Sequence, residues 1–87
     1  MLFYEYSVWF QDRNLLESDQ GHEWVACFIV ASTSQEKAKA WGDKLSNEYS
    51  TLNPNNSFVS SRIKRTNESN LPIVEFGTKP SDEYIGW

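Results

Sequence analysis

The strongest constraint on the fold is an uncharged, mostly apolar run at residues 24–31 that is followed at once by a segment with helical periodicity. The run contains β-branched residues such as Val25 and Ile29, so it predicts a strand covered on both faces. Thr33 and Glu36 then have the spacing of a capping box, which predicts a helix over residues 34–49. One stripe of this helix should face the sheet, because its apolar residues recur at helical spacing: Ala38, Trp41, Leu45, Tyr49 and Leu52.

Residues 2–11 predict a first strand by their alternation. The even positions form one apolar face, which should meet the helix: Leu2, Tyr4, Tyr6, Val8 and Phe10. The odd positions form a mixed face that still holds Phe3 and Trp9. That face is half suited to solvent and half suited to a partner.

The rest of the chain completes a ββαββ order. Polar turn residues at 53–56 end the helix, and residues 57–65 and 71–76 predict two further strands, with Pro72 at a strand start or edge. We therefore expect one α+β domain over residues 1–77, built as two hairpin-like pairs in a four-stranded, mainly antiparallel sheet with one helix packed on one face. The order resembles ferredoxin-like plaits with one helix missing, a resemblance that implies no function.

The last ten residues, 78–87, form a C-terminal tail with three apolar side chains, Tyr84, Ile85 and Trp87. We expect this tail to pack back onto the sheet, on the face that the helix leaves uncovered. The alternative is a loose tail that acts as a short linear motif.

Composition limits the partners. The chain has 87 residues with four Trp, four Tyr and five Phe, more aromatic surface than one sheet and one helix need, so a homodimer is a possible use of the excess. A net charge of −4 disfavours nucleic acids and anionic membranes. The single Cys27 should act as a small hydrophobe in a reducing compartment. Without a signal peptide or a membrane span, the sequence predicts a soluble, cytoplasmic protein.

No residues predict catalysis, a metal or a cofactor. His22 is the one histidine and stands beside acidic residues without the spacing of a zinc site. A calcium loop fails because Leu16 and Glu17 occupy required positions. The four glycines are scattered, and none forms a phosphate loop or a nucleophile elbow. The composition therefore favours a protein that is not an enzyme, although an active site assembled only in space stays open.

We expect a small acidic protein-binding module, adaptor-like or inhibitor-like, that acts through an exposed aromatic sheet face, the 12–22 loop or the tail. The alternative is a small-molecule-binding protein or enzyme with its site at a homodimer interface. Basic residues at 62, 64 and 65 either contact nucleic acid or protect an exposed strand, and the second reading is favoured. The candidate partner-binding residues are Trp9, Leu15, Leu16, Arg62, Tyr84 and Trp87.

Overall fold

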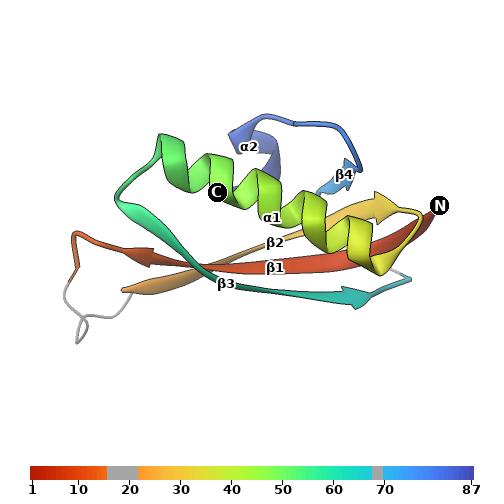
Figure 1. Ribbon diagram of the computed structural model, residues 1–87, viewed down its shortest axis with the longest axis horizontal. Helices are drawn as coiled ribbons and strands as arrows, with labels where there is room; N and C mark the ends of the chain where they lie inside the picture. Colours follow the sequence, from red (N-terminus) through yellow and green to blue (C-terminus); the bar gives the residue numbers. More distant parts are fainter. Residues whose placement is uncertain (16–21, 68–69) are drawn as a thin grey trace.

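The protein is a four-stranded mixed sheet with one long helix lying across one face (Figure 1). The structure, a computed structural model, describes residues 1–15, 22–67 and 70–87. The elements in chain order are β1 (Leu2–Asp12), β2 (Glu23–Ser32), α1 (Gln35–Leu52), β3 (Asn56–Arg65), β4 (Ile73–Glu75) and α2 (Asp82–Ile85). The predicted α+β class and ββαββ order are confirmed.

The strand order is β3-β1-β2-β4. β3 and β4 therefore lie at opposite edges of the sheet and do not pair with each other as the predicted second hairpin. β1 pairs antiparallel with both β2 and β3, whereas β4 runs parallel to β2 at the opposite edge. The prediction that β3 and β4 form a hairpin-like pair is therefore wrong. The physical reason is the length of the connection. Seven residues, 66–72, join β3 to β4, and they are enough to carry the chain past β1 and β2, because neighbouring strands are spaced about 4.8 Å apart. A tight hairpin loop needs only two to five residues.

The core lies between α1 and the apolar side of β1, as the alternation of β1 predicted. Tyr4, Tyr6, Val8 and Phe10 are buried, and the odd positions of the strand are not. The register brings Tyr6 opposite Phe28 and Val8 opposite Ala26, so β2 extends the same buried face. Burial of both strands along one face explains why the pairing of β1 with β2 has one register, since a shift by one residue would expose the whole apolar set.

The helix begins one residue later than the capping box predicted. Ser34, not Thr33, is the N-cap, and its hydroxyl accepts a hydrogen bond from the backbone N–H of Lys37 at 3.2 Å. Both residues are good caps by chemistry. Thr33 is exposed, and the extended backbone of Ser34 makes it the last residue before the helix.

The side of α1 that meets the sheet differs from the predicted stripe. Ala38 and Leu45 are buried as expected, but Trp41 and Tyr49 are half-buried, and Leu52 is 71% exposed at the end of the helix. Two small residues that hydrophobicity overlooks, Gly42 and Ser46, complete the buried side. Small side chains are needed there because Tyr6 rises from β1 into direct contact with the helix backbone.

The C-terminal tail packs on the same side of the sheet as α1, not on the uncovered side that we expected (Figure 1). Ile85 is buried in the main core, and the Trp87 ring contacts Phe10 and Phe28, with ring centroids 5.8 and 5.5 Å apart. α1 and this tail therefore cover the same face. This side of the sheet is wide enough for both α1 and the tail, because β4 pairs with β2 and adds the buried Val74 to the apolar surface.

Candidate interaction surface

One whole face of the sheet carries neither α1 nor α2 (Figure 1). We call it the open sheet face. The pairing registers define it, because residues directly opposite each other in neighbouring strands point to the same side. Its less buried side chains are Phe3, Glu5, Ser7, Trp9, Val25, Cys27, Arg62, Lys64 and Ile73.

Trp9 and Arg62 lie side by side on the open sheet face. Trp9 is opposite Ser60 and Ser7 is opposite Arg62, so the two side chains are diagonal neighbours across β1 and β3. The Arg62 guanidinium carbon is 5.7 Å from the centre of the Trp9 ring, within the range of a cation–π contact. This contact brings together two predicted partner-binding residues.

A shallow hollow of about 220 Å³ lies around this pair, lined by Glu5, Ser7, Trp9, Arg62 and Lys64. Lys64 Nζ is 3.4 Å from Glu5 Oε2, but the Lys64 side chain is two-thirds exposed, so this ion pair contributes little to stability. A pocket for a drug-sized ligand holds about 300 to 1,000 Å³. The hollow is therefore better suited to one or two side chains of a protein partner than to a small molecule.

Apolar side chains continue the open sheet face on both sides of the hollow. Phe3, Val25 and Ile73 are 42%, 49% and 47% exposed. Phe3 and Ile73 flank β2, where Ile29 and Ala31 are buried on the same face. Half-exposed apolar residues in neighbouring strands, with an aromatic–arginine pair among them, have the composition of an interface centre.

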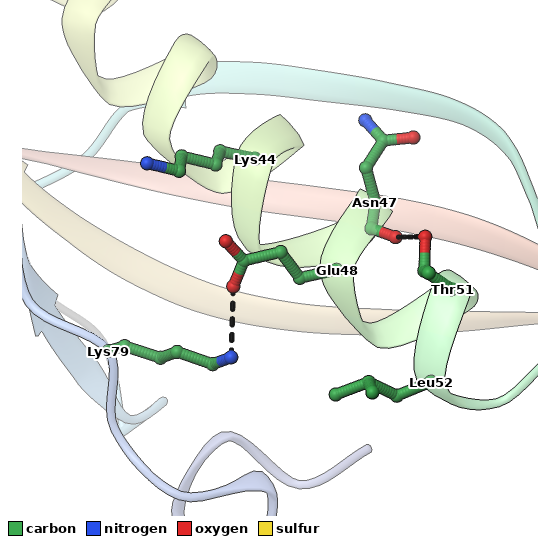
Figure 2. A pocket seen from close by; sticks show the side chains of 6 residues that line it. All are labelled: Lys44, Asn47, Glu48, Thr51, Leu52 and Lys79. Atoms are coloured by element: carbon green, nitrogen blue, oxygen red, sulfur yellow. Dashed lines mark hydrogen bonds and ion pairs between the residues drawn. The ribbon is translucent and has the colours of Figure 1, made fainter.

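A second hollow, of about 440 Å³, lies on the other side of the molecule beside α1 (Figure 2). Its six lining residues come from α1 and the tail: Lys44, Asn47, Glu48, Thr51, Leu52 and Lys79. The Lys79 amine is 2.9 Å from Glu48 Oε2, and this hydrogen bond holds the pKa of Glu48 below its usual value. The Lys44 amine lies over the Trp41 ring instead, 5.3 Å from its centre. The charged groups that line this hollow, those of Lys44, Glu48 and Lys79, are therefore bound to other side chains of the protein, and they do not converge on one point where a ligand could bind.

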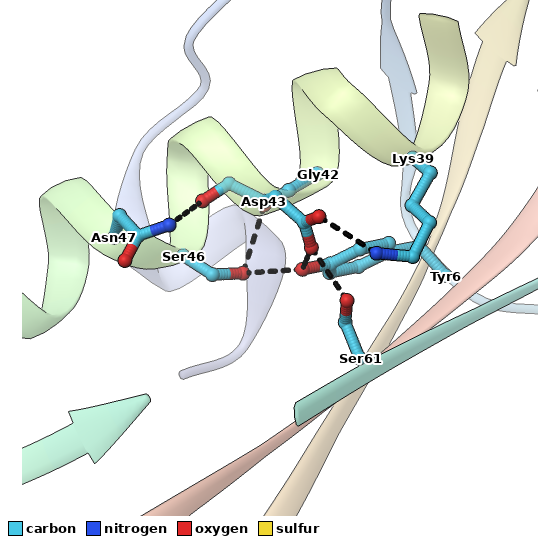
Figure 3. Close-up of polar contacts among 7 residues, drawn as sticks. All are labelled: Tyr6, Lys39, Gly42, Asp43, Ser46, Asn47 and Ser61. Carbon is cyan, nitrogen blue, oxygen red and sulfur yellow. Dashed lines mark hydrogen bonds and ion pairs between the residues drawn. The ribbon is translucent and has the colours of Figure 1, made fainter. Parts of the chain in front are cut away.

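A polar cluster between α1 and the sheet has a structural role (Figure 3). The Tyr6 hydroxyl donates a hydrogen bond to Asp43 Oδ1 at 2.7 Å and lies 3.0 Å from Ser46 Oγ. Asp43 also accepts from Ser61 and, through its other oxygen, from Lys39. Partial burial raises the pKa of Asp43, but these three donors together outweigh it and keep the pKa below its usual value. The cluster thus joins α1 to β1 and β3.

This cluster predicts how stability depends on alkaline pH. Burial raises the pKa of Tyr6 far above its ordinary value, and the Asp43 carboxylate raises it further, although Ser46 opposes the shift. The folded protein therefore retains a proton that the unfolded chain releases near pH 10. This contribution to stability is complete below about pH 10 and is lost as the pH rises above it, by up to about 1.4 kcal/mol per pH unit.

Tyr6→Phe should remove that part of the slope. At neutral pH it should also lower the free energy of unfolding by about 1 to 3 kcal/mol, because Asp43 and Ser46 lose a buried partner. Urea unfolding of both proteins from pH 7 to 11 measures the two effects. Tyr49, whose pKa burial also raises, titrates in both proteins and cancels in the difference. Parallel curves for the two proteins would contradict the role assigned to the Tyr6 proton.

The remaining predicted partner-binding residues lie elsewhere. Leu15 is half-buried in the turn after β1, and Leu16 lies outside the described residues. Tyr84 is half-exposed on α2, and its hydroxyl bonds to both backbone groups of Ile73 at the edge of β4. The Trp87 indole N–H donates to Asp82 Oδ1 at 3.0 Å while its ring contacts the core. Among the predicted residues that the structure describes, Trp9 and Arg62 are the two that come together on one surface.

Sequence reasoning missed several residues of the surface and the cluster. Val25 belongs to the apolar run that predicted a strand covered on both faces, yet it is 49% exposed, and Ile73, in a strand for which no buried side was predicted, is 47% exposed. Cys27 is half-buried on the open sheet face, where its thiol donates to Ser7 Oγ at 3.4 Å. Asp43 and Ser61 are 18 residues apart and looked like surface polar residues. Only the fold brings each of them to its partner.

Within the described residues, no three His, Cys, Asp or Glu side chains gather in a way that could hold a metal ion. The same residues include no helix that is long and apolar enough to cross a membrane. Comparisons of the chain with protein-family models, with curated proteins and with solved structures found no match.

Proposed function

We propose that this protein is a small protein-binding module that engages its partner through the open sheet face, with Trp9 and Arg62 at the centre of the contact. The observation that supports this most is that both helices pack on one side of the sheet, while on the other side Phe3, Val25 and Ile73 are each more than 40% exposed. Trp and Arg are the residue types that dominate the binding energy of protein interfaces. Their mutual contact fixes both side chains before binding, which lowers the entropy lost on association.

The alternative, a small-molecule site or enzyme at a homodimer interface, has weaker support. The hollow on the open sheet face is small, and the hollow beside α1 has its charged groups engaged internally. A homodimer itself is compatible with the proposal, since a second copy is one protein that could cover the open sheet face. The expected cytoplasmic location stays a prediction.

Affinity capture with variant baits tests the proposal. We expect a protein that co-purifies stoichiometrically with the wild-type bait to be lost from Trp9→Ala and Arg62→Ala baits. Truncation of such residues weakens binding by roughly tenfold or more each. Leu52→Ala is the matched control, because Leu52 is the most exposed leucine described and lies on α1, away from the open sheet face.

Thermal melts of all baits must first show that they remain folded. Sedimentation of the wild-type protein gives the oligomeric state. Retention of the same partner by both open-face variants, or its loss from the Leu52→Ala bait alone, would overturn the proposed surface. A dimer that Trp9→Ala dissociates, with no other partner, would make the second copy the occupant.

A further inference from the structure

The outer edge of β3 has free strand-pairing capacity. β3 is the end strand in the order β3-β1-β2-β4, and a register shift between Trp9 and Phe10 leaves residues 60–65 as its regular part. The Thr66 N–H donates a hydrogen bond to the Phe3 carbonyl. In an antiparallel pair every second residue is hydrogen-bonded to the neighbouring strand, so Lys64 and Arg62 direct their backbone groups toward β1.

The backbone N–H and C=O groups of Ser61, Ile63 and Arg65 then point away from the sheet. Among the described residues, no strand pairs with this outer side of β3. Three successive outward pairs of donors and acceptors are the pattern to which an extended peptide can add as a further strand.

The opposite edge of the sheet offers this only in part, because β4 covers β2 along residues 29–31 and leaves residues 23–28 of β2 without a second strand neighbour in the described part of the chain. β4 has three residues, and the Tyr84 hydroxyl contacts both the N–H and the C=O of Ile73, at 3.2 and 3.1 Å. The β4 edge is thus short and covered by Tyr84, whereas β3 has ten residues and, among the described residues, no strand on its outer side. Residues 23–28 of β2 carry no basic side chain, so we place the addition of an acidic strand at β3.

The charges along β3 select the occupant. Arg62, Lys64 and Arg65 are three of the eight basic residues in a chain with 12 acidic ones. Of these three, only Lys64 has an ion pair in the described part of the chain, with Glu5, so the edge stays locally positive on a negative protein. A second copy of β3 that paired antiparallel about Ile63 would place Arg62 opposite Lys64 of that copy, which is unfavourable. A nucleic acid would meet the net charge of −4 and would leave the outward backbone groups without strand partners.

Resting on the proposed function, we propose that the outer edge of β3, residues 60–65, binds an extended acidic segment of a partner protein as an added strand. Arg62 and Lys64 lie two residues apart on the open sheet face, so they would face carboxylates at positions i and i+2 of the segment. The same partner would then reach Trp9 from the edge, since Arg62 contacts its ring. The occupant is a peptide with alternating acidic and β-branched residues.

Fluorescence anisotropy with a labelled peptide of alternating Glu and Val tests this directly. We expect binding that is lost when Lys replaces Glu in the peptide, and lost when the amides on its pairing side are N-methylated. The first change removes the charge match and the second removes only the strand hydrogen bonds. Equal binding of the N-methylated peptide would overturn strand addition.

Two protein variants with the same change of charge locate the site. Lys64→Glu should weaken binding roughly tenfold, because it replaces an opposite charge beside the added strand with a like one. Lys44→Glu, on α1 beside Trp41, should leave binding unchanged, provided that thermal melts show both variants folded. An equal loss in both variants would mean long-range attraction only, and it would overturn the site.

The remaining outcomes separate this inference from the proposed function. If a single-stranded oligonucleotide binds more tightly than the peptide and competes with it, the edge binds nucleic acid and the inference is wrong. If no acidic peptide binds but a captured partner still depends on Trp9, the open sheet face retains its function and strand addition is excluded. If capture is independent of Trp9 yet lost with Lys64→Glu, the edge alone is the site.

Discussion

Phe10→Ala should lower the free energy of unfolding by about 3 to 5 kcal/mol, the largest effect that we expect from a single substitution. Phe10 is fully buried at the centre of an aromatic cluster. The centre of its ring lies 4.8 Å from Trp24, 5.3 Å from Tyr49, 5.8 Å from Trp87 and 6.5 Å from Phe58. These contacts join β1, β2, β3, α1 and the tail, so the cavity left by alanine would lie where five segments meet.

Because small domains are stable by only about 5 to 15 kcal/mol, this variant will be close to unfolding at room temperature. Urea unfolding followed by circular dichroism and Trp fluorescence measures the loss. Phe3→Ala is the matched control, since Phe3 is an aromatic residue of the same strand that points to the open sheet face and is 42% exposed. Phe3→Ala should cost about 1 kcal/mol or less. Equal losses for the two variants would show that the apolar face of β1 is misassigned.

Gly42→Ala should destabilise the protein by about 1 to 3 kcal/mol, although alanine is a better helix former than glycine. A Cβ at position 42 would lie 2.4 to 2.7 Å from three atoms of the Tyr6 ring. That ring is fully buried, and its hydroxyl is held by Asp43 and Ser46, so it has little freedom to move away. At a position without such a neighbour, the same substitution would stabilise a helix by about 1 kcal/mol, so the sign of the effect decides between the two outcomes.

A double-mutant cycle with Tyr6→Leu separates the clash from helix propensity. In the Tyr6→Leu background, Gly42→Ala should cost less than in the wild type, because the aromatic ring is no longer there. Ala40→Gly, at an exposed position of the same helix, should cost about 1 kcal/mol from propensity alone. Chemical denaturation of the wild type, the three variants of the cycle and Ala40→Gly gives each value. A stabilised Gly42→Ala protein would refute the close approach of α1 to Tyr6.

Several features of the fold were predictable because they depend on local periodicity. The alternation of β1 showed which side of the strand is buried, and the helical repeat after residue 34 located α1. The errors also have local causes. Thr33 and Ser34 are both good cap residues, so composition could not choose between them. The helical stripe was judged by hydrophobicity, which favours Trp41 and overlooks Gly42, although Gly42 is the residue that touches Tyr6.

The candidate surface was predictable only in part. The odd side of β1 already marked Trp9 as a partly exposed aromatic residue, and Arg62 was singled out as part of a basic cluster. Their contact depends on the pairing of β1 with β3, which lie about 50 residues apart in the chain. A strand's sequence shows its apolar side but carries little information about its neighbour, because backbone hydrogen bonds are the same for every partner.

By itself, the sequence determined the number and type of the long elements and the buried side of β1, since the spacing of apolar residues sets these within each segment. Tertiary structure alone decided that β3 pairs with β1, that β4 runs parallel to β2, and that the tail joins α1 on one side of the sheet. These choices arise from competition among distant segments for the same apolar surface. Among the described residues, their outcome leaves one sheet face without a helix and the outer edge of β3 without a neighbouring strand, and these are the surfaces at which we propose partner binding.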